Sequence, residues 1–406
     1  MTCIVQKFGG TSVADIDRIK AVAEKVKHEL DAGNEVAVVP SAMAGTTSQL
    51  VDYVDQVSPL YDAREYDAVV STGEQITAGL LALALQNLGV QARSWSGWQV
   101  PVITDGAHGG ARIERIETEE LDRRMKAGEV PVVTGFQGLG PDNRVTTLGR
   151  GGSDTSAVAL AAALGAERCD IYTDVDGVYT SDPRIVSKAR KLARITYEEM
   201  LEMASTGTKI LQTRAVALAM KFGQRLQVLS SYSDEPGTLV VDEDEIVEQE
   251  LVSGIAYSRD EAKITLVQVM DKPGVAAAIF GPLANANINV DMIVQNVSAD
   301  GTNTDLTFTV TENELERAVK TLEDSREAVG YSELLFDSNV VKVSVIGVGM
   351  RSHTGVAQRM FTTLAEKGIN IQVISTSEIK VSVLVAEEYT ELALRALHTA
   401  YGLDIE

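Results

Sequence analysis

The sequence predicts an α/β protein with a mainly parallel sheet sandwiched by helices, followed by two small α+β domains. Up to about residue 240, short β-branched runs alternate with longer helical stretches, and strands separated by helices are typical of a parallel sheet covered on both faces. Beyond that point one set of residues recurs at a constant spacing, which indicates two copies of one domain. A chain of 406 residues is long enough to give each domain its own core.

Strand and helix candidates alternate in the first region. Strands are expected at residues 3–6, 36–39, 69–70, 130–134, 170–173 and 226–229, and helices at residues 15–30, 75–88, 118–127, 156–164, 197–204 and 212–222. The strand runs are short and β-branched, whereas the helical stretches are longer. Because ligands gather at the carboxyl ends of parallel strands, the loops that follow these strands are the expected place for a site.

The repeat in the C-terminal third can be checked by arithmetic. Gly274-Val275-Ala276 recurs as Gly355-Val356-Ala357, and Ile288-Asn289 recurs as Ile369-Asn370, so both pairs are offset by 81 residues (355 − 274 and 369 − 288). Each copy reads as a strand, a glycine turn, a helix, a second strand, and further β-rich and helical runs, which is a βαββαβ order. The first strands of the two copies are expected at 264–269 and 341–346.

An acidic stretch at 242–250 precedes the repeat and is expected to be a solvated connector, because like charges repel and resist compact packing. It marks a domain boundary. We therefore expect a first domain at 1–245, a linker with the first small domain at 246–337, and the second small domain at 338–406.

Charge and cysteine content exclude several classes of protein. There are 36 Lys and Arg against 58 Asp and Glu, a net charge of −22, which opposes nucleic acid or an anionic membrane as a partner. Cys3 and Cys169 lie in apolar strand-like runs, so neither a disulfide framework nor a thiolate metal site is indicated. The N-terminus has no apolar signal core, and no apolar run approaches the roughly 20 residues of a membrane helix. A cytoplasmic protein is expected.

The segment Lys7-Phe8-Gly9-Gly10-Thr11-Ser12 follows the first strand and has the composition of a phosphate-binding loop. Glycines let backbone N–H groups approach an anion, a following helix adds its positive end, and the lysine adds a charge. A plain strand, turn and helix with a solvated lysine is the alternative.

Two loops after the next strand candidates could contact an anion or an ammonium group. The loop 40–47 contains Ser41 and Thr47, and Ser71-Thr72-Gly73-Glu74 follows the pair at 69–70. Glu74 could accept an ammonium group, but Ser71 and Glu74 also have capping-box spacing. Helix capping explains either loop if it stands alone.

The densest signal is Thr146-Thr147-Leu148-Gly149-Arg150-Gly151-Gly152-Ser153-Asp154-Thr155 before an Ala-rich helix. Three glycines around an arginine at a helix start form an anion-binding nest, and Arg150 could bind a carboxylate through two hydrogen bonds. Ser153 or Asp154 as an N-cap would leave the glycines unexplained, so the pattern favours a binding function.

The polar loop 172–184 follows another strand candidate and could hold the adenine, ribose and phosphates of a nucleotide, although turns at Asp-Gly and Asp-Pro fit a surface loop equally well. Thr206-Gly207-Thr208-Lys209 places another lysine near a helix start. The P-loop, dinucleotide-binding and protein-kinase signatures do not occur in the sequence.

Taken together and in this order, the motifs at 7–12, 71–74, 148–154 and 173–183 resemble the aspartokinases of the amino-acid kinase family, and the repeat resembles a pair of ferredoxin-like ACT domains. The resemblance covers essentially the whole chain. It implies the amino-acid kinase fold followed by two ACT domains, and phosphorylation of the side-chain carboxylate of L-aspartate by ATP with Mg²⁺, the first step toward lysine, threonine and methionine.

The resemblance also implies roles for single residues. The ATP phosphates would be contacted by Lys7, Gly9 and Gly10, with Ser41 nearby, at the substrate. Aspartate would be held by Thr47, Glu74, Arg150 and Ser153, and Asp154 would order the catalytic lysines Lys7 and Lys209. The nucleotide site would be lined by Thr173, Asp174, Tyr179, Asp182, Arg184 and Lys209. No protein metal ligand is implied. Because an aspartate carboxylate is already ionised at pH 7, no general base is required.

The repeat suggests regulation by amino acids, with lysine and threonine as the expected effectors. In the first copy Asp271 precedes a helix start that could hold a carboxylate, and the resemblance adds Gly274, Ala276, Gln295, Asn370 and Ile371 as effector residues. It further implies a homo-oligomer through ACT domains, or a hetero-oligomer with a shorter regulatory subunit.

Two other functions stay open from the sequence. A kinase of the same fold that acts on glutamate or acetylglutamate would share the nucleotide residues, but the motifs of Glu74 and Arg150 argue against it. A non-catalytic amino-acid sensor would keep the repeat and lose Lys7, Asp154 or Lys209, whereas all three are present.

Overall fold

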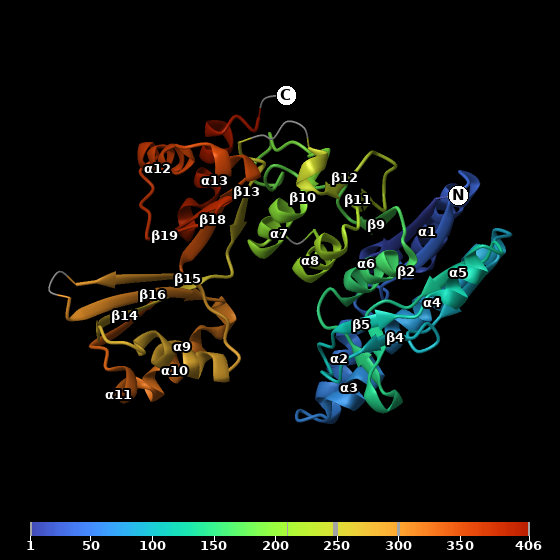
Figure 1. Ribbon diagram of the computed structural model, residues 1–406, viewed down its shortest axis with the longest axis horizontal. Coiled ribbons are helices and arrows are strands. Elements are labelled where there is room, and N and C mark those ends of the chain that lie inside the picture. The colour runs from blue at the N-terminus through green and yellow to red at the C-terminus, as the bar shows by residue number, and fades with distance from the viewer. Residues whose placement is uncertain (1, 209, 247–250, 299–300, 405–406) are drawn as a thin grey trace. The chain divides into compact units, whose positions relative to one another are not determined.

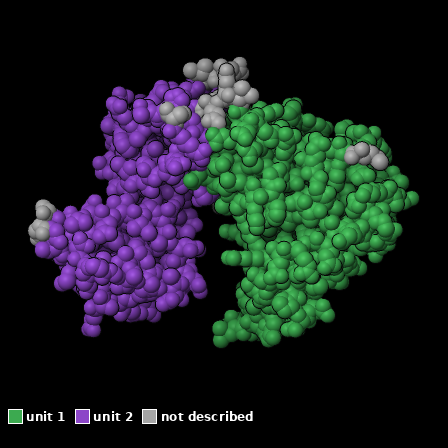
Figure 2. Space-filling model, viewed as in Figure 1, with its two compact units in different colours: residues 1–178, 191–204, 209–247 green, residues 179–190, 205–208, 248–406 purple. Residues whose placement is uncertain are grey.

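The computed structural model describes residues 2–208, 210–246, 251–298 and 301–404 (Figure 1). The chain forms two compact units (Figure 2). Unit 1 contains residues 1–178, 191–204 and 209–247, and unit 2 contains residues 179–190, 205–208 and 248–406. Two short segments, 179–190 and 205–208, therefore belong with the C-terminal repeat and not with the region that surrounds them in sequence.

Unit 1 is built on an eight-stranded sheet in the order β10-β12-β11-β9-β1-β2-β6-β3. Its pairs are parallel except for β11 with β12. The strands are β1 (Cys3–Phe8), β2 (Glu35–Pro40), β3 (Ala92–Trp95), β6 (Val130–Val133), β9 (Arg168–Thr173), β10 (Arg194–Thr196), β11 (Leu226–Ser230) and β12 (Thr238–Val241). A smaller sheet contains β5 (Ile113–Ile116), β4 (Val102–Thr104), β7 (Gln137–Leu139) and β8 (Val145–Thr147).

Helices cover the main sheet because the strand residues alternate between two apolar faces. Val36 and Val38 of β2 pack in one core with residues of α1 and α4, so Ala37 and Val39 point to the opposite face, and α6 also packs against β2. The helices of this part of the chain are α1 (Ile16–Asp31), α2 (Thr46–Val57), α3 (Ala63–Val70), α4 (Thr72–Asn87), α5 (Glu119–Met125), α6 (Gly152–Leu164), α7 (Tyr197–Ser205) and α8 (Thr213–Phe222). The six helices expected from the sequence are confirmed.

The strand expected at residues 69–70 is wrong, because these residues end helix α3. Asp62 begins this helix by accepting a hydrogen bond from the backbone N–H of Arg64, and the buried residues Asp67 and Val70 are three apart, the spacing of one helix face. Among the described residues, only the stretch Ala63–Asn87 is long and apolar enough to cross a membrane; it forms α3 and α4, and half of its apolar window is buried inside the protein.

The first repeat in unit 2 has the expected βαββαβ order. It contains β14 (Ala262–Met270), α9 (Val275–Asn285), β15 (Asp291–Val297), β16 (Asn303–Val310), α10 (Leu315–Asp324), α11 (Arg326–Val329) and β17 (Glu333–Asp337), with the sheet order β15-β16-β14-β17. Helices α9 and α10 pack on each other below this sheet in Figure 1.

The second repeat differs from the expectation in its last strand. It contains β18 (Val340–Ile346), α12 (Val356–Glu366), β19 (Val373–Thr376), β20 (Lys380–Ala386) and α13 (Thr390–Ala400), and the described residues after α13 form no strand. Instead β13 (Gly254–Ser258), which precedes the first repeat, pairs antiparallel with β18 in the sheet order β13-β18-β20-β19. The first repeat is therefore inserted into the second, and the two are not simply consecutive.

Candidate active site

Lys7 and Asp154 form a buried ion pair at the carboxyl end of the sheet. Lys7 lies near the end of β1 and Asp154 in the first turn of α6, with 2.5 Å between Lys7 Nζ and Asp154 Oδ1. Their exposed fractions are 8% and 7%. A lysine held in a dry setting by one carboxylate, beside a helix N-terminus, is suited to meet a phosphate group.

The glycines after Lys7 keep backbone open around its ammonium group. A Cβ atom added to Gly9 would lie 3.4 Å from Lys7 Nζ, and one added to Gly10 would lie 3.1 Å from the carbonyl oxygen of Ala42. The N–H of Gly9 donates to the Tyr172 carbonyl on β9, which fixes this turn to the neighbouring strand. Glycine at both positions therefore keeps further side chains away from the Lys7 ammonium group and the loop after β2, as a phosphate-binding loop requires.

Glu74 is a buried carboxylate with one oxygen unsatisfied. It lies in the first turn of α4 with 3% exposure. Its Oε1 accepts a hydrogen bond from the backbone N–H of Ala42 at 3.1 Å, while Oε2 has no hydrogen-bond partner among the residues that the structure describes. Desolvation by burial raises the pKa of Glu74 to about 7. A buried carboxylate oxygen without a donor is expected to bind a ligand that brings one.

The capping-box reading of residues 71–74 is wrong. Ser71 makes no side-chain cap hydrogen bond to α4, because its hydroxyl donates to the carbonyl of Ala68 in the preceding helix. The Glu74 carboxylate accepts instead from the Ala42 N–H in the loop after β2. The spacing in the sequence thus fitted a cap, while the side chains contact other elements.

The backbone conformation and the close packing at the start of α6 require its glycines. Gly149 and Gly151 have positive φ angles of 76° and 70°, and a Cβ on Gly152 would lie 2.7 Å from the ring of Phe136. Arg150 between them is exposed, whereas Ser153 is buried, packed so closely on Gly135 that a Cβ there would lie 2.8 Å away. Gly151 occupies the N-cap position, so neither Ser153 nor Asp154 is the N-cap.

Ser41 and Thr47 flank the loop that Glu74 contacts. Both are partly buried, Ser41 directly after β2 and Thr47 in the first turn of α2. The backbone N–H of Ser41 donates to the Phe8 carbonyl, which holds this loop to the end of β1.

The expected nucleotide residues are divided between the two units. Thr173 ends β9 in unit 1, and its hydroxyl donates to Asp174 at 3.1 Å. Tyr179, Asp182 and Arg184 belong to unit 2. There, Arg184 and the Tyr257 hydroxyl both donate to Asp182, and the pKa of Asp182 is lowered, chiefly by the hydrogen bond from Arg184. Lys209 lies outside the described residues.

The expected effector residues fall in two groups within unit 2. Asp271, Gly274 and Ala276 are exposed around the start of α9, and Gly274, with φ 92°, is its N-cap. Gln295 lies on β15, and Asn370 and Ile371 come just before β19. Strands β15 and β19 contact each other, so the second group comes from elements at the junction of the two repeats.

Asp67 is a buried residue at this site that the sequence did not reveal. It is fully buried on α3, and its carboxylate accepts hydrogen bonds from His108 Nδ1 at 2.7 Å, the Gly109 N–H at 3.1 Å and the Thr147 hydroxyl at 2.5 Å. These bonds tie the 106–110 loop to the end of β8, directly before the glycine-rich turn. No local signal pointed to Asp67, because its partners lie 41 to 80 residues further along the chain.

A second unforeseen support is Arg214 on α8. Its guanidinium donates to the carbonyls of Leu148 and Ala111, each at 2.7 Å. Burial lowers the pKa of Arg214. A charged donor on α8 thus holds the backbone directly before the turn that carries Arg150.

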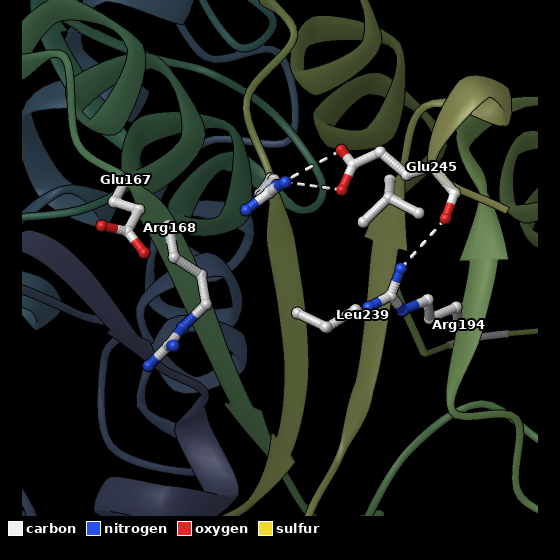
Figure 3. Close-up of a pocket in the computed structure, with 7 residues that line it drawn as sticks. Glu167, Arg168, Arg194, Leu239 and Glu245 are labelled. Carbon is white, nitrogen blue, oxygen red and sulfur yellow. Dashed lines mark hydrogen bonds and ion pairs between the residues drawn. The ribbon is translucent and has the colours of Figure 1, made fainter.

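A cavity of about 130 Å³ lies at the amino ends of β9, β10 and β11, opposite the carboxyl ends that carry the candidate site (Figure 3). Arg168 and Arg194 line it from the starts of β9 and β10, and Arg225 from just before β11. Arg168 is paired with Asp170, Arg225 with the Glu245 carboxylate, and Arg194 donates to the Glu245 carbonyl. Since these arginines already have partners, the cavity is not a convincing anion site.

Known proteins match this chain over its whole length. The model of the amino acid kinase family matches residues 2–230, and an ACT domain model matches residues 264–325 and 343–401. An aspartate kinase of Stutzerimonas stutzeri is 57% identical over 405 residues, covering 100% of this chain and 98% of that protein. An aspartokinase of Pseudomonas aeruginosa is 56% identical over 406 residues with the same coverage. Among solved structures, E. coli aspartokinase III in complex with aspartate and ADP has a TM-score of 0.81 at 28% identity, covering 98% of this chain and 99% of that one.

The fold and the site therefore define a kinase with an amino acid kinase domain and ACT domains. The chain belongs to the amino acid kinase family and, within it, to the aspartate kinases.

Proposed function

We propose that this enzyme transfers the γ-phosphoryl group of ATP to the side-chain carboxylate of L-aspartate, giving 4-phospho-L-aspartate and ADP. The observation that carries the proposal is Glu74, whose buried, unsatisfied Oε2 can accept the ammonium group of an amino acid. The neighbour from E. coli was solved with aspartate and ADP, which fits this substrate pair.

The substrate supplies its own nucleophile, so the protein has to position and neutralise charge. A carboxylate oxygen of aspartate forms a bond to the γ-phosphorus as the bond to the ADP oxygen breaks. In this proposal Lys7 and the open backbone at Gly9 and Gly10 bind the phosphates, and Asp154 holds Lys7 in place through the 2.5 Å ion pair. No step needs a proton acceptor.

The remaining substrate roles follow from position. Arg150 is exposed at a turn whose positive φ angles its flanking glycines allow and whose preceding carbonyl, that of Leu148, accepts from Arg214, so its guanidinium is free to bind the α-carboxylate of aspartate. Ser153, Ser41 and Thr47 would add hydroxyl donors around the same substrate. Thr173, Asp174, Tyr179, Asp182, Arg184 and Lys209 are proposed for the nucleotide.

Mg²⁺ would enter on the nucleotide. Among the described residues no group of three or more His, Cys, Asp or Glu side chains is placed to hold a metal ion, so the ATP phosphates would supply most of its ligands. When bound, the ion would neutralise charge on the transferring phosphoryl group.

Regulation by lysine, threonine or both is proposed for unit 2. The exposed Asp271 beside the start of α9 offers a carboxylate for an effector ammonium group and helix N–H groups for its carboxylate. E. coli aspartokinase III was also solved with lysine and aspartate, with a TM-score of 0.78 to this chain at 28% identity. We further propose a cytoplasmic enzyme of lysine, threonine and methionine synthesis that assembles through its ACT domains as a homo-oligomer or with a shorter regulatory subunit.

Trapping of the acyl phosphate with hydroxylamine tests the reaction directly. The expected result is ATP-dependent hydroxamate with L-aspartate, little with L-glutamate, and less when lysine and threonine are added together. Preference for glutamate would keep the kinase and overturn the substrate. Failure to form hydroxamate with either amino acid would favour a non-catalytic sensor.

A further inference from the structure

The segment 179–190 starts from the catalytic sheet but is folded into the second repeat. Val186 is buried with Val341, Val383 and Leu397 in the core of that repeat, and Ile185 packs against the same core. Its two ends are fixed in unit 1, where the N–H of Val178 donates to the Thr238 hydroxyl and the N–H of Leu192 to the Val178 carbonyl, both at 2.8 Å. The segment itself therefore packs in the core of the second repeat, while the residues that flank it are bonded within unit 1.

Thr180 is the central contact of this segment. Its N–H donates to the Arg190 carbonyl, and its hydroxyl oxygen accepts from the Arg190 N–H, both at 2.9 Å, which closes the segment on itself. Its carbonyl accepts from the N–H of Ile255 on β13 at 2.8 Å. Its hydroxyl also lies 2.9 Å from His398 Nε2 on α13. One fully buried threonine therefore joins the segment to a strand and a helix of the regulatory unit.

His398 contacts Thr180 through its ring nitrogen Nε2. The residue is 1% exposed, and its Nδ1 has no hydrogen-bond partner in the described part of the chain. The Thr180 hydroxyl accepts from Arg190, which leaves its hydrogen to point at His398 Nε2. A buried histidine with one ring nitrogen unsatisfied needs a reason beyond packing, and the contact with Thr180 supplies one.

We propose that His398 is a positioning residue: through Thr180 it sets the conformation of segment 179–190, and so transmits the state of the regulatory unit to nucleotide binding. This rests on the proposed nucleotide role of Tyr179, Asp182 and Arg184, which lie in that segment. The segment 205–208, which leads to Lys209, also belongs to unit 2. Two segments linked to the nucleotide site are thus built on the unit that would bind effectors.

The test compares variants that remove the contact with variants that keep it. H398L and T180V remove it at nearly constant volume, whereas H398Q and T180S leave a polar atom or hydroxyl in place. S344A is the matched control, because Ser344 is equally buried in the same repeat and, among the described residues, its hydroxyl bonds Ser382 alone, at 2.7 Å. Thermal denaturation identifies any variant that has failed to fold.

The expected result is a rise of about tenfold in KM for ATP in both H398L and T180V, with KM for aspartate within about twofold. Inhibition by lysine plus threonine should weaken in the same two variants and persist in H398Q, T180S and S344A. The double variant H398L/T180V should be no worse than either single one, because the two residues share one contact. Equal changes in H398L and S344A, or an unchanged KM for ATP in T180V, would overturn the inference.

Calorimetric titration with ADP separates this inference from the proposed reaction. If wild type binds ADP but phosphorylates no aspartate, the substrate assignment fails, and the inference still predicts weaker ADP binding in H398L and T180V. If aspartate is phosphorylated and ADP binding is the same in wild type and both variants, the inference fails alone.

Discussion

Unit 1 and unit 2 each bury an ionisable side chain, and the two side chains differ in whether their polar atoms have partners. In unit 1, Glu74 has one carboxylate oxygen without a donor, and desolvation raises its pKa to about 7. In unit 2, Lys342 on β18 lies 2.5 Å from Glu261 and 2.9 Å from Asp291, both in the first repeat. Burial would lower the pKa of Lys342, but the two carboxylates outweigh it and the pKa is raised.

The difference separates binding from architecture. A buried charge left half-satisfied costs stability until a ligand completes it, so it marks a binding site. A buried charge surrounded by opposite charges joins elements together and has no capacity left for a ligand. Lys342 joins the two repeats beside the apolar contact of Met292 with Val340, whereas Glu74 is the residue that we propose for substrate binding.

The largest expected effect is that of Lys7→Met. Loss of the ammonium group should lower kcat by about 10³-fold or more, because a donor aimed at developing charge is removed from a dry site. Hydroxamate formation measures this. The control is Lys20→Met, an exposed lysine on α1, which should keep normal activity. A fall of less than tenfold in kcat for Lys7→Met would contradict the role.

Next in size is Glu74→Gln. The neutral amide cannot pair with an ammonium group, so kcat/KM for aspartate should fall by about 10²-fold while KM for ATP stays constant. Initial rates at varied aspartate and ATP give both constants. A parallel loss for both substrates would indicate a damaged fold and not a lost contact.

Lys342→Met should act on stability instead. Removal of one partner from a buried pair leaves Glu261 uncompensated and should lower the free energy of unfolding by about 3–5 kcal/mol. Urea denaturation, followed by a signal that reports on unit 2, measures this change in the free energy of unfolding. Lys263→Met, which loses only a hydrogen bond to the Gln372 amide, should cost less. A Lys342→Met protein as stable as wild type would remove the contrast with Glu74.

The pH dependence sharpens the comparison further. Because the pKa of Glu74 is about 7 in the unliganded protein, kcat/KM for aspartate should fall about tenfold per unit as the pH drops below 7, where the carboxyl group is neutral. Rates from pH 5.5 to 8.5 test it. The same profile in Glu74→Gln should lose this step; its persistence would assign the titration to another group.

The smallest expected effect on catalysis is that of Asp271→Ala. This exposed residue is far in sequence from the site, so uninhibited activity should stay within about twofold of wild type. Inhibition by lysine plus threonine should be relieved, as inhibition curves would show. Unchanged inhibition would sink the effector assignment.

Much of the fold and part of the site could be predicted from the sequence, because they rest on local patterns. Helices such as α1 show their apolar face directly, and the glycines around Arg150 announce a turn that only they can form. The replacement of the last strand of the second repeat by β13, and the transfer of segment 179–190 to unit 2, depend on pairing between distant residues. Nothing local distinguishes a strand that pairs with its neighbour from one that pairs about ninety residues on.

The same limit explains the missed site residues. Asp67 and Arg214 work through hydrogen bonds to loops 40 to about 100 residues away in sequence. Ser71 and Glu74 had the spacing of a local cap, yet their partners are Ala68 and Ala42. Residue types and spacing indicated the loops that we propose for substrate binding, and tertiary contacts decide which partner each side chain has there.

Thermal denaturation of wild type and Glu74→Gln at pH 8, with and without L-aspartate, tests the central claim most directly. The folded-state pKa of Glu74 is raised from 4.5 to about 7, so its stabilising effect is complete below pH 4.5 and is lost as the pH rises through 7. The account therefore predicts that unliganded Glu74→Gln melts above wild type at pH 8, and that aspartate raises the melting temperature of wild type only. A Glu74→Gln protein that melts below wild type without ligand, or that gains as much from aspartate, would contradict it.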